Sequence, residues 1–311
     1  VLAAAAFLVR DGFLNNQNCK VGYLGDLRTL AGARKAMAIS LTYGSCFESI
    51  AEHSGCDLFL TSILASNTQA IRALVNRKGK RRNKQPHYHL LRQFSTCAIH
   101  FTFKKRLKPS KYKIVRATRS DIRDIIDFLH RDHSARLFGY RFDQGEFEHR
   151  LANWPNYRLE NTYMAIDQRH RIVGVTTLWD AKDVKRYQVL AYRGSMKWVK
   201  KSFNLGAKLF RFPPLPEEKE VFNYFYLSNL SIENDNPEIL KALLHQIYSD
   251  NHAKGYHFFT LPLDAEDPLE PAIKGFMARH LWFNLYAVSS SRNPLIDFPA
   301  TGRTGFELAL A

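Results

Sequence analysis

The sequence has no hydrophobic run long enough to cross a membrane. Its longest run, VLAAAAFLV at residues 1–9, is about half the length that a spanning helix requires. No basic segment precedes this run, as one would in a secretory signal peptide. We therefore expect no membrane partner and interpret the run as a strand. Because the chain opens inside this element with Val1, we expect further residues before it and a first domain that is only partial.

Cysteine is scarce, and its spacing excludes the common cysteine motifs. The four cysteines, Cys19, Cys46, Cys56 and Cys97, form no C-x-x-C pair and have no zinc-site spacing. The twelve histidines include no H-E-x-x-H motif. We expect reduced thiols, a cytoplasmic protein and no bound metal.

Acidic residues are missing from one long stretch. Residues 77–119 hold fifteen Lys and Arg and no Asp or Glu, which accounts for nearly all of the formal net charge of +16. Such a stretch is either a solvated loop and interdomain linker, or a surface for a polyanion or the phosphates of a cofactor. Aromatic residues do not alternate with these charges as they do in nucleic-acid motifs, so nucleic acid is a disfavoured partner.

The chain is long enough for two domains. It has 311 residues, 45% of them hydrophobic, and Pro109 within KKRLKPSKYK is the best boundary. We therefore predict one domain over residues 1–108 and another over 109–311. Hydrophobic periodicity predicts an α/β protein. The expected strands cover 2–9, 20–30, 57–64, 88–103, 112–117, 162–167, 171–179, 222–232, 257–263, 282–288 and 305–309, and the expected helices 34–53, 67–75, 120–131, 144–152, 237–254 and 269–280, with an irregular stretch between residues 180 and 221.

Both predicted domains contain segments that resemble one superfamily. In the first, these are VGYLGDLR at residues 21–28 and FLTSILASNTQAIRALV at 59–75. In the second, they are KIVRATRSDIRDIIDFL, RIVGVTTLWD and FNYFYLSNLSI. The segments and their order resemble the GNAT N-acetyltransferases, arranged in tandem, with the first domain truncated at its N-terminus. The resemblance implies that an acetyl or similar acyl group passes from coenzyme A to an amine. It also implies an α+β mixed sheet in each domain. The fourth and fifth strands of that sheet run parallel and splay apart, as expected for residues 23–28 and 59–64, which a helix connects.

The pyrophosphate loop of that superfamily has a weak counterpart here. Its pattern is Arg or Gln, two residues, Gly, one residue, and Gly or Ala, whereas this sequence has Arg34-Lys35-Ala36-Met37-Ala38-Ile39. A helix start with Arg34 and Lys35 still suits the phosphates of acetyl-CoA. The alternative is that both side chains are merely solvated. In the second domain, Glu233 and Asp235 occupy the corresponding helix start and would repel a pyrophosphate, so we expect that domain to be degenerate.

The resemblance also implies roles in catalysis. Asp26, on the strand before the loop, corresponds to the general base, and the backbone of Leu27, Arg28 and Thr29 to the edge that contacts the cofactor. Strict alternation would place Asp26 on the same face as Leu24 and Arg28. The alternative for Asp26 is a simple ion pair with Arg28.

Two more residues have implied roles beside structural alternatives. Asn67 corresponds to a residue that contacts the pantetheine arm, although Asn is also a good helix N-cap. Tyr88 is the nearest substitute for the general acid, although it also suits an aromatic core. The rival to an acyltransferase is a catalytically inactive relative in which the basic stretch binds a polyanion or another partner.

Overall fold

The protein is described from a computed structural model. The structure describes residues 3–14, 16–29, 37–76, 85–106, 109–291, 302–305 and 307. Before Pro109 the elements are β1 (Ala3–Leu14), β2 (Gln17–Thr29), α1 (Met37–Ser54), β3 (Leu58–Leu64), α2 (Thr68–Leu74) and β4 (His87–His100).

The chain after Pro109 begins with β5 (Lys113–Arg116), η3 (Arg119–Asp121), α3 (Ile122–Ser134), β6 (Gly139–Tyr140), α4 (Gln144–Asn153), η4 (Leu159–Asn161), β7 (Thr162–Ile166) and β8 (Ile172–Trp179). It continues with α5 (Met196–Phe210), β9 (Tyr224–Ile232), η5 (Glu233–Asp235), α6 (Pro237–Asn251), β10 (Phe258–Asp264), η6 (Glu270–Ile273) and β11 (Met277–Ser289). No helix among these described residues is long and apolar enough to cross a lipid bilayer.

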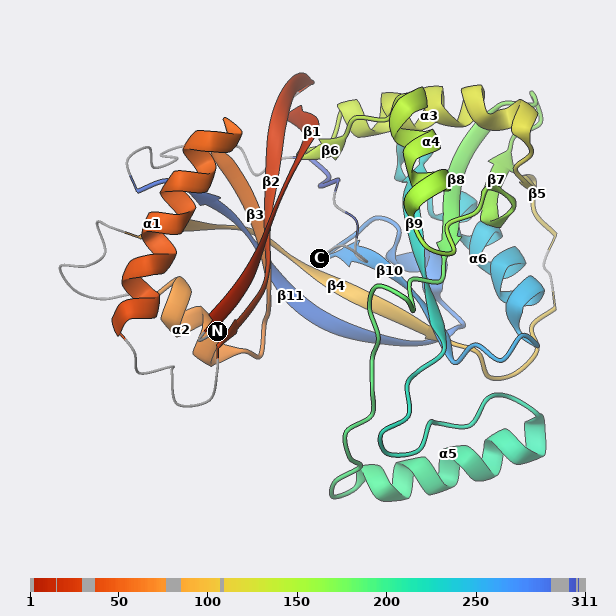
Figure 1. Ribbon diagram of the computed structural model, residues 1–311. Coiled ribbons are helices and arrows are strands. Elements are labelled where there is room, and N and C mark those ends of the chain that lie inside the picture. The colour runs from red at the N-terminus through yellow and green to blue at the C-terminus, as the bar shows by residue number, and fades with distance from the viewer. Residues whose placement is uncertain are drawn as a thin grey trace.

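The strands of both parts form one continuous sheet. Its order is β5-β7-β8-β9-β10-β4-β11-β3-β2-β1-β6. Strand β4 from the first part lies between β10 and β11 of the second, and β11 lies between β4 and β3 of the first. Figure 1 shows β4 and β11 running across the middle of the molecule and joining its two sides. The division into domains at Pro109 stays a prediction.

Each part contains one parallel strand pair that splays apart. Strands β2 and β3 pair only through Gly22 with Phe59 and Tyr23 with Leu60. Strands β9 and β10 pair through residues 224–226 and 258–260. Helices α1 and α6 make the two crossovers, which is why the paired strands run parallel. The predicted parallel, splayed pairs are therefore confirmed in both parts.

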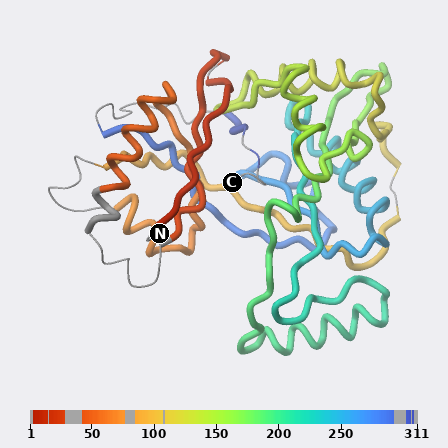
Figure 2. The backbone as a smooth tube through the Cα atoms, viewed as in Figure 1, coloured from red at the N-terminus to blue at the C-terminus, as the bar shows by residue number. Residues whose placement is uncertain are grey.

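Helices cover the sheet beside both pairs, as Figures 1 and 2 show. On α1, Phe47 is buried and its ring lies 5.0 Å from that of Phe59 on β3. The Phe59 ring in turn lies over Gly22, where any larger residue would collide with it. On α6, the residues at spacings of three and four are all buried: Ile239, Leu240, Leu243, Leu244, Ile247 and Tyr248. The amphipathic helix predicted there is confirmed.

Several expected elements are wrong. Residues 269–280 form no long helix, because Gly275 has a φ of +89° and β11 begins at Met277, where it pairs with β4. The stretch between 180 and 221 is not wholly irregular, since it contains α5. Strand β1 extends to Leu14, well beyond the expected end at residue 9. Of the expected strand 305–309, residues 306, 308 and 309 lie outside the described residues.

Candidate functional site

The splay between β2 and β3, here called the first opening, contains a cavity of about 680 Å³. Residues of β1, β2, β3, β4, β11 and both helices of the first part line it, together with the loop at residues 184–187 that follows β8. The predicted site residues among the lining are Asp26, Leu27, Arg28, Asn67 and Tyr88. The structure thus brings five of the predicted residues around one cavity.

The other predicted residues are not among the cavity-lining residues that the structure describes. Thr29 ends β2, and its backbone follows directly on the lining residue Arg28. Arg34, Lys35 and Ala36 lie outside the described residues, so their predicted contact with a pyrophosphate stays a prediction. Helix α1, whose start they precede, is described from Met37.

A β-bulge shapes β2 at the first opening. Ala6 of β1 pairs with Gly25 and Ala4 with Arg28, so two residues of β2, Asp26 and Leu27, face the single residue Ala5. Asp26 has a φ of +51°, the left-handed conformation that Asp tolerates better than most residues. The strict alternation expected through residue 28 is therefore wrong, because the bulge adds one residue to the strand.

Asp26 is partnered on the rim of the cavity. Its Oδ1 lies 3.3 Å from Nη2 of Arg28, and both side chains are largely exposed, at 75% and 82%. The ion pair considered from the sequence is thus present, and at this exposure it contributes little stability. It leaves the carboxylate open to solvent and to the cavity.

Lys185 is a lining residue that the sequence did not indicate. Burial lowers the pKa of Lys185, and the Asp26 carboxylate opposes this by favouring the charged amine. The residue lies in the loop between β8 and α5, which reads as irregular sequence and reaches the first opening only through the tertiary fold.

Hydroxyl groups cross-link the walls of the cavity. The Tyr23 hydroxyl lies 2.9 Å from Oγ of Ser62, and Oγ1 of Thr61 donates to the carbonyl of Leu24 at 2.8 Å. These two contacts hold β2 and β3 at a fixed distance after their backbone pairing has ended. On the α1 side, the hydroxyls of Tyr43 and Tyr88 lie 2.7 Å apart.

Asn67 begins α2 beside these groups. Its side chain accepts a hydrogen bond from the backbone N–H of Ala70 at 3.1 Å, so the predicted N-cap is confirmed. The same residue also lines the cavity, which keeps the capping and ligand-contacting roles compatible.

The splay between β9 and β10, here called the second opening, repeats this architecture. Thr177 of β8 pairs with Ser228 and Val175 with Ser231, so β9 has a bulge where Asn229 takes a φ of +52°. The sequence repeats as well: Tyr-Leu-Gly-Asp-Leu at 23–27 corresponds to Tyr-Leu-Ser-Asn-Leu at 226–230. Asn229 is therefore the counterpart of Asp26.

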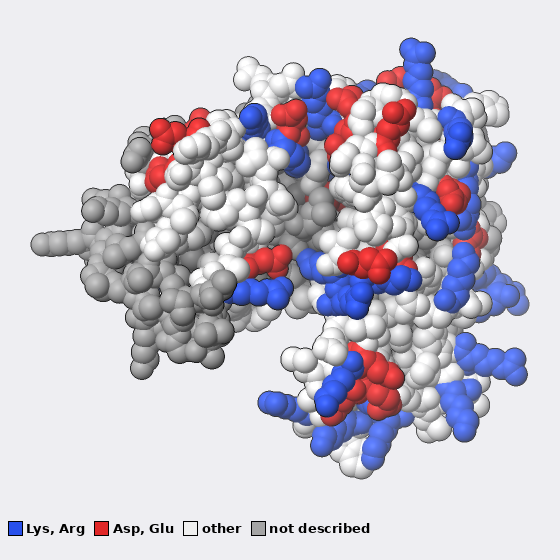
Figure 3. Space-filling model, viewed as in Figure 1, with Lys and Arg blue, Asp and Glu red and all other residues white. Residues whose placement is uncertain are grey.

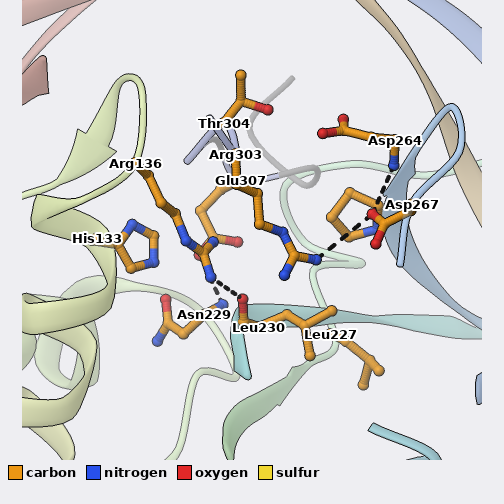
Figure 4. Close-up of a pocket in the computed structure, with 11 residues that line it drawn as sticks. His133, Arg136, Leu227, Asn229, Leu230, Asp264, Asp267, Arg303, Thr304 and Glu307 are labelled. Atoms are coloured by element: carbon orange, nitrogen blue, oxygen red, sulfur yellow. Dashed lines mark hydrogen bonds and ion pairs between the residues drawn. The ribbon is translucent and has the colours of Figure 1, made fainter. Parts of the chain in front are cut away.

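The second opening is filled by the chain itself. Arg303, Thr304 and Glu307 lie in it, and the cavity that remains is about 30 Å³ (Figure 4). Oε1 of Glu307 accepts a hydrogen bond from the backbone N–H of Asn229 at 2.9 Å and lies 3.7 Å from the buried Arg150. Figure 4 also shows Arg136, which donates to the carbonyl of Leu230 at 3.0 Å.

The helix start in the second part is capped by its own residues. Asn236 accepts a hydrogen bond from the N–H of Glu238 at 3.0 Å, so α6 has an ordinary N-cap. Asp235 forms an ion pair with Arg303, which also lies 3.7 Å from Asp267. Asp267 follows β10 as Asn67 follows β3. Its side chain also accepts a hydrogen bond from a backbone N–H, that of Leu269 at 2.9 Å, whereas Asn67 accepts from Ala70.

Comparison with known proteins identifies the fold. No protein-family model and no curated protein matches the sequence. A GCN5-related N-acetyltransferase from Sphaerobacter thermophilus superposes with a TM-score of 0.57 at 14% identity, over 96% of this chain and 79% of that one. The glucosamine N-acetyltransferase region of a fungal GH3 β-N-acetylglucosaminidase gives 0.56 at 10%, over 92% and 31%.

A third solved structure is N-myristoyltransferase from Saccharomyces cerevisiae with bound myristoyl-CoA. Its TM-score is 0.54 at 10% identity, over 92% of this chain and 66% of that one. The identities are low, so the likeness is one of fold. The chain has the mixed α/β fold of GCN5-related N-acetyltransferases, so the predicted resemblance to the GNAT superfamily is confirmed for the fold, and the tandem arrangement stays a prediction.

Proposed function

We propose that the protein is an N-acyltransferase that moves an acyl group from coenzyme A to an amine, with the thioester bound in the first opening. The observation that carries this proposal is the bulge at Asp26 beside a large cavity. In the second opening the N–H of the corresponding residue, Asn229, binds a carboxylate oxygen of Glu307. A backbone N–H with the same placement in the first opening would polarise the thioester carbonyl and stabilise the oxyanion that forms on it.

The fold neighbours support an acyl-CoA donor. Two are named as acetyltransferases, and the yeast enzyme holds myristoyl-CoA. We propose acetyl-CoA as the donor, and an amine of unknown identity as the acceptor. We also propose that residues 1–108 form the part that binds the donor, and that residues 109–311 have lost a donor site and shape the acceptor side, in a protein of the cytoplasm.

Three of the lining side chains have proposed roles in the reaction. The amine loses a proton to Asp26, directly or through a water, attacks the carbonyl carbon and forms the C–N bond. The C–S bond then breaks, and Tyr88, held by Tyr43, gives a proton to the leaving thiolate. Lys185 lines the same cavity and adds positive charge beside Asp26.

The other predicted residues would bind the donor. The backbone of Leu27, Arg28 and Thr29 would lie along the pantetheine arm, which Asn67 would also contact. Arg34, Lys35 and Ala36 would bind the pyrophosphate at the start of α1. The side chains of Arg28, Lys185 and Arg186 around the cavity add positive charge toward an anionic donor.

Calorimetric titration of the full-length protein with acetyl-CoA tests the proposal. We expect one site per chain, and acylation of members of a panel of amines. A parallel titration with myristoyl-CoA tests the length of the acyl group. If neither thioester binds, the acyltransferase proposal fails and the inactive relative takes its place.

A further inference from the structure

Helix α5 stands apart from the rest of the fold. It belongs to the long connection between β8 and β9, and Figures 1 and 2 show it lying below the sheet and its covering helices. It contains fifteen residues, MKWVKKSFNLGAKLF. Its position as a separate layer raises the question of what each of its faces contacts.

One face of α5 packs against the loop that follows it. Asn204 accepts a hydrogen bond from the N–H of Leu215 at 2.8 Å, and the Phe203 ring lies 5.0 Å from that of Phe212. Lys200 pairs with Glu217, and Ala207 is buried. The α5 residues in these contacts recur at spacings of three and four, so they form one stripe that attaches the helix. They are Lys200, Phe203, Asn204 and Ala207.

The opposite face of α5 is apolar and exposed. Trp198, Leu205 and Leu209 have exposed fractions of 71%, 71% and 72%. Their spacings of seven and four residues place them in one line along the helix. Side chains of this size are normally buried, so a line of three at such exposure marks a surface built for a partner.

A row of lysines borders this apolar line. Lys197, Lys201 and Lys208 are exposed and also lie four and seven residues apart. Nζ of Lys201 lies 5.1 Å from the centre of the Trp198 ring. Residues 193–211 hold six Lys and Arg and no Asp or Glu. Figure 3 shows basic side chains along the lower edge of the molecule, where Figure 1 places α5.

We propose that α5 binds the surface of an anionic lipid bilayer and lies in the plane of the headgroups. Trp and Leu on one face with lysines beside them is the pattern of an interfacial helix, in which the apolar line enters the acyl boundary and the lysines contact anionic headgroups. Trp is favoured at that depth because its ring is amphipathic. A purely polar acidic surface would satisfy the lysines but not the apolar line. The proposal does not depend on acyl transfer.

Vesicle flotation with the whole protein tests this proposal. We use phosphatidylcholine vesicles, alone or with about 30% phosphatidylglycerol, at two salt concentrations. We expect the protein to bind only the vesicles that contain phosphatidylglycerol, and we expect this binding to weaken at high salt. Trp198 fluorescence should shift to the blue on binding, and the shift should be absent in Trp198→Phe.

Two sets of variants separate the two contributions. Leu205→Ser with Leu209→Ser removes the apolar line, and Lys197→Glu, Lys201→Glu and Lys208→Glu reverses the row of charges. Both sets leave the attached stripe intact, and each should lower binding at least about tenfold. The matched control reverses three exposed arginines on and beside α3, Arg119, Arg123 and Arg131, and should bind as the parent does.

Three results would overturn the proposal. The first is equal binding to neutral and anionic vesicles, and the second is equal loss in the control. The third is no vesicle binding at all. In that case, light scattering would show whether the same face joins two copies of the chain, and an acidic-protein column would show whether it takes a protein instead.

Discussion

Asn229 occupies in β9 the place that Asp26 occupies in β2. Both residues sit at a bulge opposite an antiparallel neighbour, three residues after the parallel pairing ends at Tyr226 and Tyr23, and their φ angles are +52° and +51°. One opening contains a large cavity, and the other is filled by Glu307. The chain thus holds the same backbone device twice, and only one copy has room for a ligand among the residues described.

Asp26→Asn tests the proposed base directly. Asn tolerates the left-handed conformation at this bulge and is the residue that the second repeat uses, so the fold should be unchanged. The amide cannot accept the proton, so the acylation rate should fall by about 10² to 10⁴ while coenzyme affinity stays the same. Steady-state rates and calorimetry measure the two effects. An Asn variant that acylates as fast as the parent would make Asp26 structural.

Reversing the charges before α1 tests where the donor binds. Arg34→Glu with Lys35→Glu should weaken acetyl-CoA binding by about 1 to 3 kcal/mol, the range for charge-assisted hydrogen bonds. The matched control, Glu233→Gln before α6, should change the affinity little, because the second opening is already filled. Calorimetry measures both. An equal loss in the two variants would refute the assignment to the first part.

Much of the fold follows from local pattern, and the rest depends on long-range pairing. The stripe from Ile239 to Tyr248 predicts α6 because every third or fourth residue is apolar. The interleaving of β4 with β11 leaves no trace in periodicity, since a central strand is apolar whatever its neighbour. Helix α5 is not among the predicted elements, although Trp198, Leu205 and Leu209 recur at helical spacing in its sequence.

The part of the site that the sequence predicts consists of residues in or near the family-like segments. Asp26 and Asn67 lie in segments that resemble a known family, Tyr88 is the nearest substitute for its general acid, and all three line one cavity. Lys185 comes from an irregular loop that reaches this cavity only in three dimensions, so neither spacing nor motif could indicate it. The sequence also does not reveal the bulge at Asp26. One extra residue in a strand shifts the alternation of its side chains but leaves the composition of the segment the same.

Glu307→Ala should destabilise the fold. It leaves the N–H of Asn229 without its carboxylate and removes one counter-charge from Arg150, whose side chain is fully buried. The expected loss in the free energy of unfolding is about 1 to 3 kcal/mol, measured by urea denaturation. Glu160→Ala removes a 66% exposed carboxylate 3.8 Å from Arg158 and should cost almost nothing. Equal stability of both variants would mean that Glu307 does not hold the second opening closed.

His100 should make stability depend on pH. Burial, with Arg279 and His257 adding to it, lowers the pKa of His100 to about 4 from 6.5. The folded protein therefore binds fewer protons than the unfolded chain between these values, so its stability is full above pH 6.5 and falls as the pH drops toward 4. The free energy of unfolding that His100 removes as the pH falls to 4 is on the order of 2 to 3 kcal/mol.

Urea midpoints at several pH values test this expectation. His100→Gln should flatten the acid side of the profile, although the buried His133, whose pKa is also lowered, keeps part of the slope. His170→Asn, at an exposed turn with positive φ, is the control and should leave the profile unchanged. A parallel shift of the whole curve in His100→Gln would indicate lost packing against Phe258 instead of lost proton linkage.

Gly22→Ala should disturb the base of the first opening. A Cβ at Gly22 would lie 2.0 Å from Cδ1 of Phe59, and that ring is completely buried between Phe47 and Phe7, so it has no room to move away. Overpacking of this kind costs about 1 to 3 kcal/mol or more, and urea denaturation should show a loss in that range. Gly145→Ala in α4 is the control, since a Cβ there would meet only Oδ1 of Asp143, at 3.5 Å.

Because Gly22 and Phe59 form half of the parallel pairing before the splay, Gly22→Ala should also weaken acetyl-CoA binding, whereas Gly145→Ala should not. Full stability together with full affinity in Gly22→Ala would show that β2 and β3 can separate without consequence, and would remove the rigid splay from the account of the site.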